Sequence, residues 1–360
     1  MSRLKQCIVA ISTVTTSVVA AAIIVEIGLR IAGLSYPLWI GLDLQLGASF
    51  RPGLSGRFSR EGSAQVSINS DGFNAPNFKR EKVENELRIA VIGDSFVAAL
   101  QVDQDQHFSV FTREGVKRCL PNRYIAVLPF GVNGFNTVQQ LLTYRHRVRG
   151  FKPDIVVLAP FAENDIPENT RRAFSIPYAS HENGNLVIHV DHIQTPEFTA
   201  LREDWERKAR IINRFHVLQL LIEAKIYLDY FLNRPKDRRD GQGAIHSEAD
   251  WHAMDLLIGQ FAKEVRRDGA VPVTAPVHSA EPADLTGSSS LRDSKMLRQI
   301  AANHNMHFID VLEPMSKLVR TSGMDFHRFE HKIEGGHYNV AGHREYGRLL
   351  GEALCGMLGK

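Results

Sequence analysis

Three residues of this chain have the types and settings that nucleophilic catalysis requires: Ser95, His337 and Glu334. Ser95 follows the apolar run 88–92, where a buried strand gives way to an apparent helix start. A serine at such a junction lies at the carboxyl edge of a sheet, with its backbone N–H at a helix N-terminus. Its hydroxyl needs a neighbouring base, and His337 lies in a glycine-flanked segment before the last helical pattern. Glu334, three residues earlier, would orient the imidazole and stabilise its cation.

An oxyanion formed at Ser95 would need hydrogen-bond donors, and three groups are candidates. These are the Ser95 N–H, the Gly134 N–H, which no side chain shields, and the side-chain amide of Asn164. Each residue, taken singly, also fits a structural role as a helix cap or turn residue. We expect Asp94 and Asp165 to hold loops rather than react. His331 is a weaker candidate for the base, and His343 fits helix packing.

Five short apolar runs alternate with helical patterns, which predicts a parallel sheet covered on both faces. The runs are 88–92, 124–128, 154–159, 271–275 and 307–311. Ser95, Gly134, Asn164 and His337 follow the first, second, third and fifth of them. Because parallel strands end at one edge of a sheet, the four residues are expected to converge there.

The order of these residues resembles the SGNH hydrolases, the GDSL-type esterase and lipase superfamily. Four blocks carry the resemblance, which covers about residues 86–358: Gly93-Asp94-Ser95, Asn133-Gly134-Phe135, Asn164-Asp165-Ile166 and His337-Tyr338-Asn339. It implies a three-layer α/β/α fold, with a flavodoxin-like, doubly wound, parallel five-stranded sheet. It also implies Ser95 as nucleophile, His337 as base, and an oxyanion hole made by Ser95, Gly134 and Asn164.

Two positions depart from the family pattern. Glu334 stands where the family has Asp, so the acid is one methylene longer and a Ser-His dyad remains an alternative. Ala162 replaces a family glycine two residues before Asn164, a change of little chemical consequence. With its N-terminal segments, the chain looks like the membrane-tethered members found in bacteria.

The uncharged run from Cys7 to Val25 is long enough to cross a bilayer. Arg3 and Lys5 precede it, which predicts a single-pass anchor with a cytoplasmic N-terminus and an extracytoplasmic catalytic domain, periplasmic or at the cell surface. A cleaved signal peptide is the alternative, because Ala20-Ala21-Ala22 offers a processing site.

We expect three regions: an anchor over 1–35, a linker with a hairpin over 36–85, and a hydrolase domain over 86–360. The hairpin is centred on the turn Asn69-Ser70-Asp71-Gly72, and a plain linker is the alternative. An insertion at about 166–246 interrupts the α/β alternation directly after a strand. Its position predicts a cap over the active edge.

Composition excludes several function classes. A net charge of +3 over 360 residues is too small to indicate nucleic-acid binding. Three cysteines without a C-x-x-C pair exclude a cysteine-built zinc site, and His181, His189 and His192 have no familiar metal spacing. Cys119 and Cys355 either pair in an oxidising compartment or remain thiols. We expect neither a metal nor an organic cofactor.

The sequence therefore predicts a serine ester hydrolase that acts through an acyl-enzyme on an acyl ester of a cell-surface glycan or a lipid. An O-acyltransferase using the same site is one alternative. A non-catalytic glycan-binding protein on the same fold is another. The sequence gives no indication of the oligomeric state.

Overall fold

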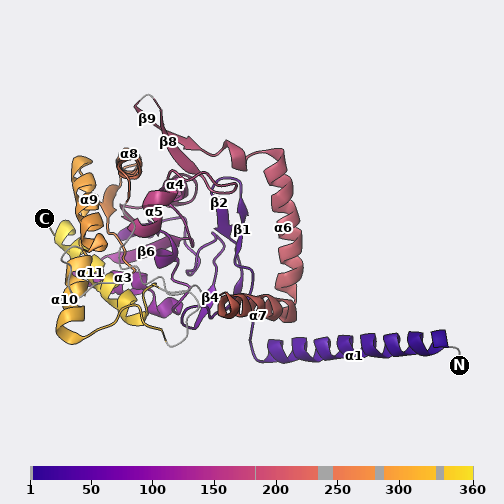
Figure 1. The fold of residues 1–360 in the computed structure, drawn as a ribbon. Helices are drawn as coiled ribbons and strands as arrows, with labels where there is room; N and C mark the ends of the chain where they lie inside the picture. Colours follow the sequence, from indigo (N-terminus) through magenta and orange to yellow (C-terminus); the bar gives the residue numbers. More distant parts are fainter. Residues whose placement is uncertain (1–2, 183, 234–245, 280–287, 330–335, 360) are drawn as a thin grey trace.

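The structure is a computed structural model that describes residues 3–182, 184–233, 246–279, 288–329 and 336–359. A parallel five-stranded sheet forms its centre (Figure 1). The strands are β5 (Glu86–Gly93), β6 (Tyr124–Gly131), β7 (Ile155–Ala159), β10 (Val271–Thr274) and β11 (His307–Phe308), in the order β11-β10-β7-β5-β6. The expected doubly wound α/β fold is confirmed.

Alternate residues of β5 point to opposite faces of the sheet, and each face has its own helices. Ile89 and Val91 join a core with α3 (Phe108–Cys119) and α11 (Val340–Leu358). Ala90 and Ile92 join the other core with α4 (Thr137–Thr143) and α8 (Glu248–Arg267). Burial on both faces explains why this strand is an unbroken apolar run after Arg88.

The remaining helices of the α/β body extend these two layers. α9 (Ser289–Asn303) adds Leu297 to the α4–α8 side, and α10 (Leu312–Ser322) adds Met315 to the α3–α11 side. The apolar spacing over 137–148, 247–267, 291–303 and 340–357 predicts α4, α8, α9 and α11, whereas no pattern predicts α3 or α10.

A disulfide joins Cys119 at the end of α3 to Cys355 near the end of α11. The two helices pack closely, because a Cβ on Gly115 would lie 2.9 Å from the Gly351 Cα. Of the two alternatives for these cysteines, the structure has the pair. A disulfide fits an oxidising compartment outside the cytosol.

Residues 36–85 form two antiparallel hairpins that share the core of the α/β body. The first is β1 (Ile40–Asp43) with β2 (Gly47–Phe50), and the second is β3 (Ser55–Phe58) with β4 (Ala64–Ser67). Their buried side chains pack in the same cluster as the α4–α8 face of the sheet. These are Trp39, Leu46, Phe50, Phe58, Val66, Ile68 and Phe73.

The insertion after β7 contains a hairpin and two long helices. β8 (Tyr178–Glu182) pairs with β9 (Asn185–His189), followed by α6 (Pro196–Arg214) and α7 (His216–Leu232). The apolar spacing over 198–232 predicts one long helical stretch, but the backbone leaves the helical region at Phe215, with φ −117° and ψ 114°. α7 therefore takes a direction different from that of α6 (Figure 1).

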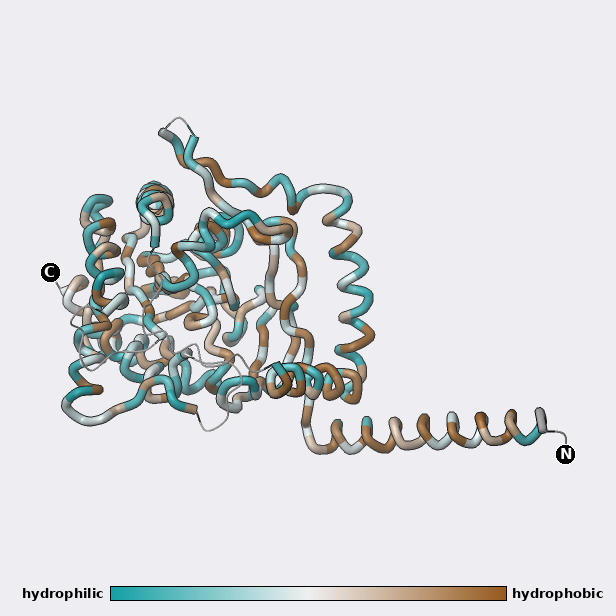
Figure 2. The backbone as a smooth tube through the Cα atoms, viewed as in Figure 1, coloured by the Kyte–Doolittle hydropathy of each residue, from teal (hydrophilic) through white to brown (hydrophobic). Residues whose placement is uncertain are grey.

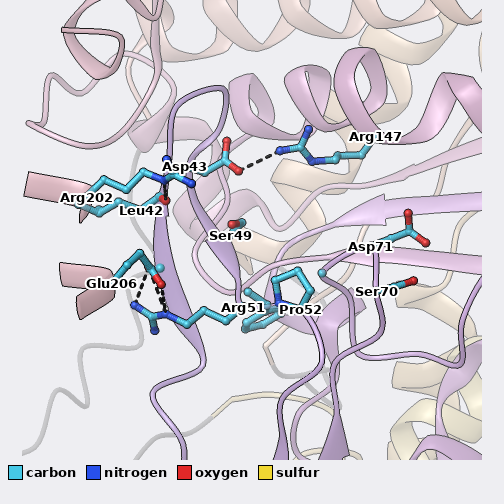
Figure 3. Close-up of a pocket in the computed structure, with 13 residues that line it drawn as sticks. Leu42, Asp43, Ser49, Arg51, Pro52, Ser70, Asp71, Arg147, Arg202 and Glu206 are labelled. Atoms are coloured by element: carbon cyan, nitrogen blue, oxygen red, sulfur yellow. Dashed lines mark hydrogen bonds and ion pairs between the residues drawn. The ribbon is translucent and has the colours of Figure 1, made fainter. Parts of the chain in front are cut away.

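A cavity of about 440 Å³ lies between the β1–β2 hairpin and α6 (Figure 3). Two ion pairs lie in its lining: Arg51 with Glu206 at 3.0 Å, and Arg147 with Asp43 at 2.9 Å. The ion pairs connect the hairpin to α6 and to the segment after α4. Ser95 does not line this cavity.

The N-terminal helix α1 (Arg3–Ile31) projects from the body (Figure 1). Among the described residues it is the one helix long and apolar enough to cross a membrane, over Lys5–Ile31. Apolar and neutral colours continue along most of α1 (Figure 2), so it lacks the single polar face of a helix that covers a soluble body.

Candidate active site

Ser95 and His337 lie within hydrogen-bonding distance. The His337 Nε2 atom is 2.8 Å from the Ser95 Oγ atom, although the residues are 242 positions apart. Ser95 is 8% exposed and the His337 side chain 17% exposed, so the pair lies just beneath the surface. This is the geometry that a nucleophile and its general base require.

The second ring nitrogen of His337 contacts a carboxylate from the other end of the chain. The Glu61 Oε2 atom is hydrogen-bonded to His337 Nδ1, and the Glu61 Oε1 atom accepts from the His337 backbone N–H at 3.2 Å. Because a carboxylate only accepts, Nδ1 carries the hydrogen and Nε2 is left to accept from Ser95. Glu61 has no exposed surface, so the imidazolium would form beside a desolvated negative charge.

Glu61 is a candidate orienting acid that the sequence did not reveal. Glu334, the expected acid, lies outside the described residues, as does His331. Glu61 lies in the turn between β3 and β4, in the region expected to be a linker. It makes the contact with the imidazole Nδ1 that we expected of the orienting acid.

Aromatic rings and a backbone turn hold His337. The Phe96 ring lies 5.1 Å from the imidazole and 4.9 Å from the Phe161 ring. Asn339, two residues later, caps α11 by accepting from the Gly342 N–H at 2.9 Å. The start of α11 therefore fixes the position of the backbone next to His337.

Asp94 sets the backbone at Ser95. Its carboxylate caps α2 (Ser95–Ala98) by accepting from the Phe96 N–H at 3.0 Å. This helix begins at Ser95 and is a single turn, whereas the apolar pattern predicted a helix over 97–100. Gly131 at the end of β6 makes room for it, because a Cβ there would lie 2.1 Å from the Ala98 N atom.

The predicted oxyanion-hole residues follow the strands after which they were expected: Ser95 follows β5, Gly134 follows β6 and Asn164 follows β7. Asn164 is in α5 (Ala162–Glu168), and its Nδ2 atom is 3.4 Å from the Asp94 Oδ2 atom, which is 3.5 Å from the Ser95 Oγ. Gly134 follows β6 with φ +74°, a conformation that favours glycine, and a Cβ there would meet nothing within 4 Å. The role of these groups as oxyanion donors stays a prediction.

Two buried carboxyls support the loop ends. Burial raises the pKa of Asp94 to about 6, although the Phe96 N–H and the charge of His337 oppose the rise. Burial and then the nearby charge of Asp94 raise the pKa of Asp165 well above its usual value. Asp165 accepts from Gln140 Nε2 at 2.7 Å and from the Phe161 N–H at 3.1 Å. Both carboxyls make the loop contacts expected of positioning residues.

A pair of buried histidines lies behind the site. The His107 and His343 rings are stacked with centroids 5.7 Å apart. Burial lowers the pKa of His107 to about 4, and burial together with neighbouring histidines lowers the pKa of His343 well below its usual value. His107 accepts from the Ser109 N–H at 3.1 Å and therefore donates from Nε2 to the Val97 carbonyl at 3.0 Å. Neutral His107 thus braces α2, and His343 packs as expected.

Within the described residues no group of three or more His, Cys, Asp or Glu side chains could hold a metal ion. Ser95, His337 and Glu61 by themselves form a nucleophile–base–acid array. Such an array can attack an acyl carbon through the serine oxygen.

Comparisons with known proteins found similarity in fold alone. No protein-family model and no curated protein sequence matches the chain. LAE5, an alpha/beta hydrolase enzyme from the metagenome of Lake Arreo, Spain, is 12% identical with a TM-score of 0.43, covering 78% of this chain and 99% of its own. The acetyl xylan esterase AlAXEase is 13% identical with a TM-score of 0.43, covering 74% and 99%. TesA is 14% identical with a TM-score of 0.40, covering 74% and 96%. Overlaps this loose carry no functional conclusion.

Proposed function

We propose that this protein is a serine ester hydrolase of the SGNH type. The observation that carries the proposal is the array Ser95–His337–Glu61, with 2.8 Å between the Ser95 Oγ and the His337 Nε2. The array lies at the carboxyl edge of the sheet, where open α/β folds place their ligands.

In the proposed reaction, the Ser95 oxygen attacks the ester carbonyl carbon and its proton moves to His337 Nε2. The Glu61 carboxylate stabilises the imidazolium that forms. The oxyanion is bound by the N–H groups of Ser95 and Gly134 and by the Asn164 amide. Collapse expels the alcohol with the proton from His337 and leaves an acyl-enzyme. Water, deprotonated by His337, then releases the acid and restores the serine.

The proposed setting is an extracytoplasmic membrane surface. α1 is long and apolar enough to span a bilayer, and Arg3 and Lys5 at its start favour a cytoplasmic N-terminus. The Cys119–Cys355 disulfide supports an oxidising compartment for the body. The proposed substrate is an acyl ester of a cell-surface glycan, with a lipid ester as the second choice.

The test is activity-based labelling of the full chain in detergent with a fluorophosphonate probe. Wild type is expected to label and to hydrolyse a panel of short-chain and long-chain esters, whereas Ser95→Ala should do neither. The unfolding midpoint of Ser95→Ala is the control for folding. It should equal that of wild type, because replacing serine by alanine removes one atom and leaves little void. Wild-type protein that folds but neither labels nor cleaves any ester would refute the proposal.

A further inference from the structure

Helix α7 turns its polar side chains inward and its apolar side chains outward. Its two buried residues are Gln219, 1% exposed, and Glu223, 8% exposed. Leu221, Leu228 and Leu232 are 62%, 55% and 72% exposed. They recur at intervals of seven and four residues, so they share one helix face. A helix that covers a body in water has the opposite arrangement.

Three inward polar residues of α7 have partners in the body, and these contacts specify the orientation of the helix. Glu223 pairs with Arg60 at 3.2 Å. Gln219 accepts from the Tyr36 N–H at 2.6 Å, and the Tyr227 hydroxyl donates to the Ser59 carbonyl at 2.5 Å. Rotating α7 to bury its leucines would break these bonds and leave buried polar groups unpaired.

α7 packs against the last turns of α1 (Figure 1). The Val217 N–H at its start donates to Glu26 of α1 at 2.9 Å, and Arg30 of α1 donates to the Arg214 carbonyl at 2.6 Å. If α1 crosses the bilayer, α7 therefore lies at the level where the chain leaves it.

The residues near the start of α7 are of the types found at a membrane–water interface. Phe215 and Trp205 are each 41% exposed, and aromatic side chains favour the membrane–water interface. The second half of α6 carries Arg207, Lys208, Arg210 and Arg214. Cations near a surface of anionic lipid are attracted to its headgroups.

We propose that α7 is an interfacial membrane helix, whose outward face, Leu221, Leu228, Phe231 and Leu232, inserts into the lipid bilayer that holds α1. The inference rests on the membrane anchorage proposed above and adds a second point of contact. Two contacts would fix the tilt of the body over the bilayer, whereas one helix and a flexible joint would not.

The inward contacts of α7 also connect it to the candidate active site. Ser59 and Arg60, which α7 holds, directly precede Glu61. The bilayer thus supports the hairpin turn that supplies the carboxylate to His337. α7 is a positioning element and touches no reacting atom.

The experiment measures the surroundings of single labelled positions in the full chain, reconstituted at one copy per nanodisc of phosphatidylcholine and phosphatidylglycerol. In a Cys7→Ser background, Leu228→Cys on α7 is labelled with the fluorophore NBD. Lys295→Cys, exposed on α9, is the matched control, and Val18→Cys marks the membrane depth of α1. The Cys119–Cys355 disulfide leaves no other thiol to react.

The label at Leu228 should be quenched by lipids with nitroxide-bearing acyl chains. Its quenching by aqueous iodide should be severalfold weaker than at Lys295. Equal iodide quenching at both positions, with the Val18 label embedded, would overturn the α7 proposal and leave the anchor intact. A Val18 label in water would refute the anchor itself and with it the α7 proposal. Shielding from iodide without nitroxide quenching would mean that protein covers α7, and would also overturn the proposal.

Discussion

Glu61 and His337 are hydrogen-bonded across 276 positions of sequence, so the β3–β4 hairpin completes an array whose proposed nucleophile and base belong to the α/β domain. Replacing Glu61 by Gln keeps the shape of the side chain but removes the charge that stabilises the imidazolium. We expect kcat to fall about 10⁴-fold, the loss seen when the acid of such a triad is neutralised. Steady-state kinetics on an ester measure this.

Glu334→Gln is the matched control for that prediction. If Glu61 is the orienting acid, the Glu334 variant should keep kcat within a few-fold of wild type. A large loss at Glu334 with near-normal activity at Glu61 would contradict the assignment.

Asn164→Ala tests the oxyanion hole. Loss of one such donor costs roughly 2.7–4 kcal/mol of barrier, so kcat should fall about 10²–10³-fold with little change in KM. A rise in KM at constant kcat would assign Asn164 to substrate binding instead. The unfolding midpoint should stay near that of wild type, because the Asn164 side chain is partly exposed.

His107 makes the stability of the fold depend on pH. Its pKa is about 4 in the folded protein against 6.5 for the ordinary side chain, so between these values the unfolded chain binds more protons. The free energy of unfolding should therefore fall as the pH drops from 6.5 to 4, by about 3 kcal/mol from this residue.

The comparison is with His107→Gln, which removes this titrating group. Asp94, whose pKa is raised to about 6, acts in the opposite sense over the same range, but equally in both proteins. Denaturant titrations at several pH values should show a steeper acid loss in wild type. Parallel curves would contradict the burial of a neutral His107.

The disulfide should contribute to stability without contributing to turnover. It joins residues 236 positions apart, and closing a loop of that length stabilises a fold by roughly 3–5 kcal/mol. The double variant Cys119→Ser, Cys355→Ser should lose about that much unfolding free energy, while kcat is unchanged wherever it stays folded. Equal stability of wild type with and without reductant would show that the bond does not form.

Strand and helix patterns in the sequence predicted most of the fold. For the proposed site they indicated Ser95 and His337 but not Glu61. The strand before Ser95 and the helix after His337 were readable because their apolar spacing is local, and the topology then brought the loops together. Glu61 was not readable, because its role depends on where a distant hairpin docks. Glu334 was the nearer carboxylate in sequence, which made it the natural candidate.

The insertion shows a second limit. The pattern over 198–232 predicted helix correctly, but not the break at Phe215 or the face that α7 buries. The spacing of apolar residues predicts the buried face of a helix only when that face is apolar, and the buried face of α7 is polar. The partners of Gln219 and Glu223 come from the segment after α1 and from the β3–β4 turn, which no local rule connects to α7.

The hairpin that carries Glu61 rests on the first residues after α1: the Arg57 N–H donates to the Ser35 carbonyl at 2.7 Å, and Trp39 is buried in the shared core. A proteolytic cut between Ile31 and Ser35 would separate the body from α1 with this support intact. A cut beyond Trp39 would leave the hairpin that carries Glu61 without these contacts. Cleavage there should therefore abolish the proposed activity as well as separate the body from α1.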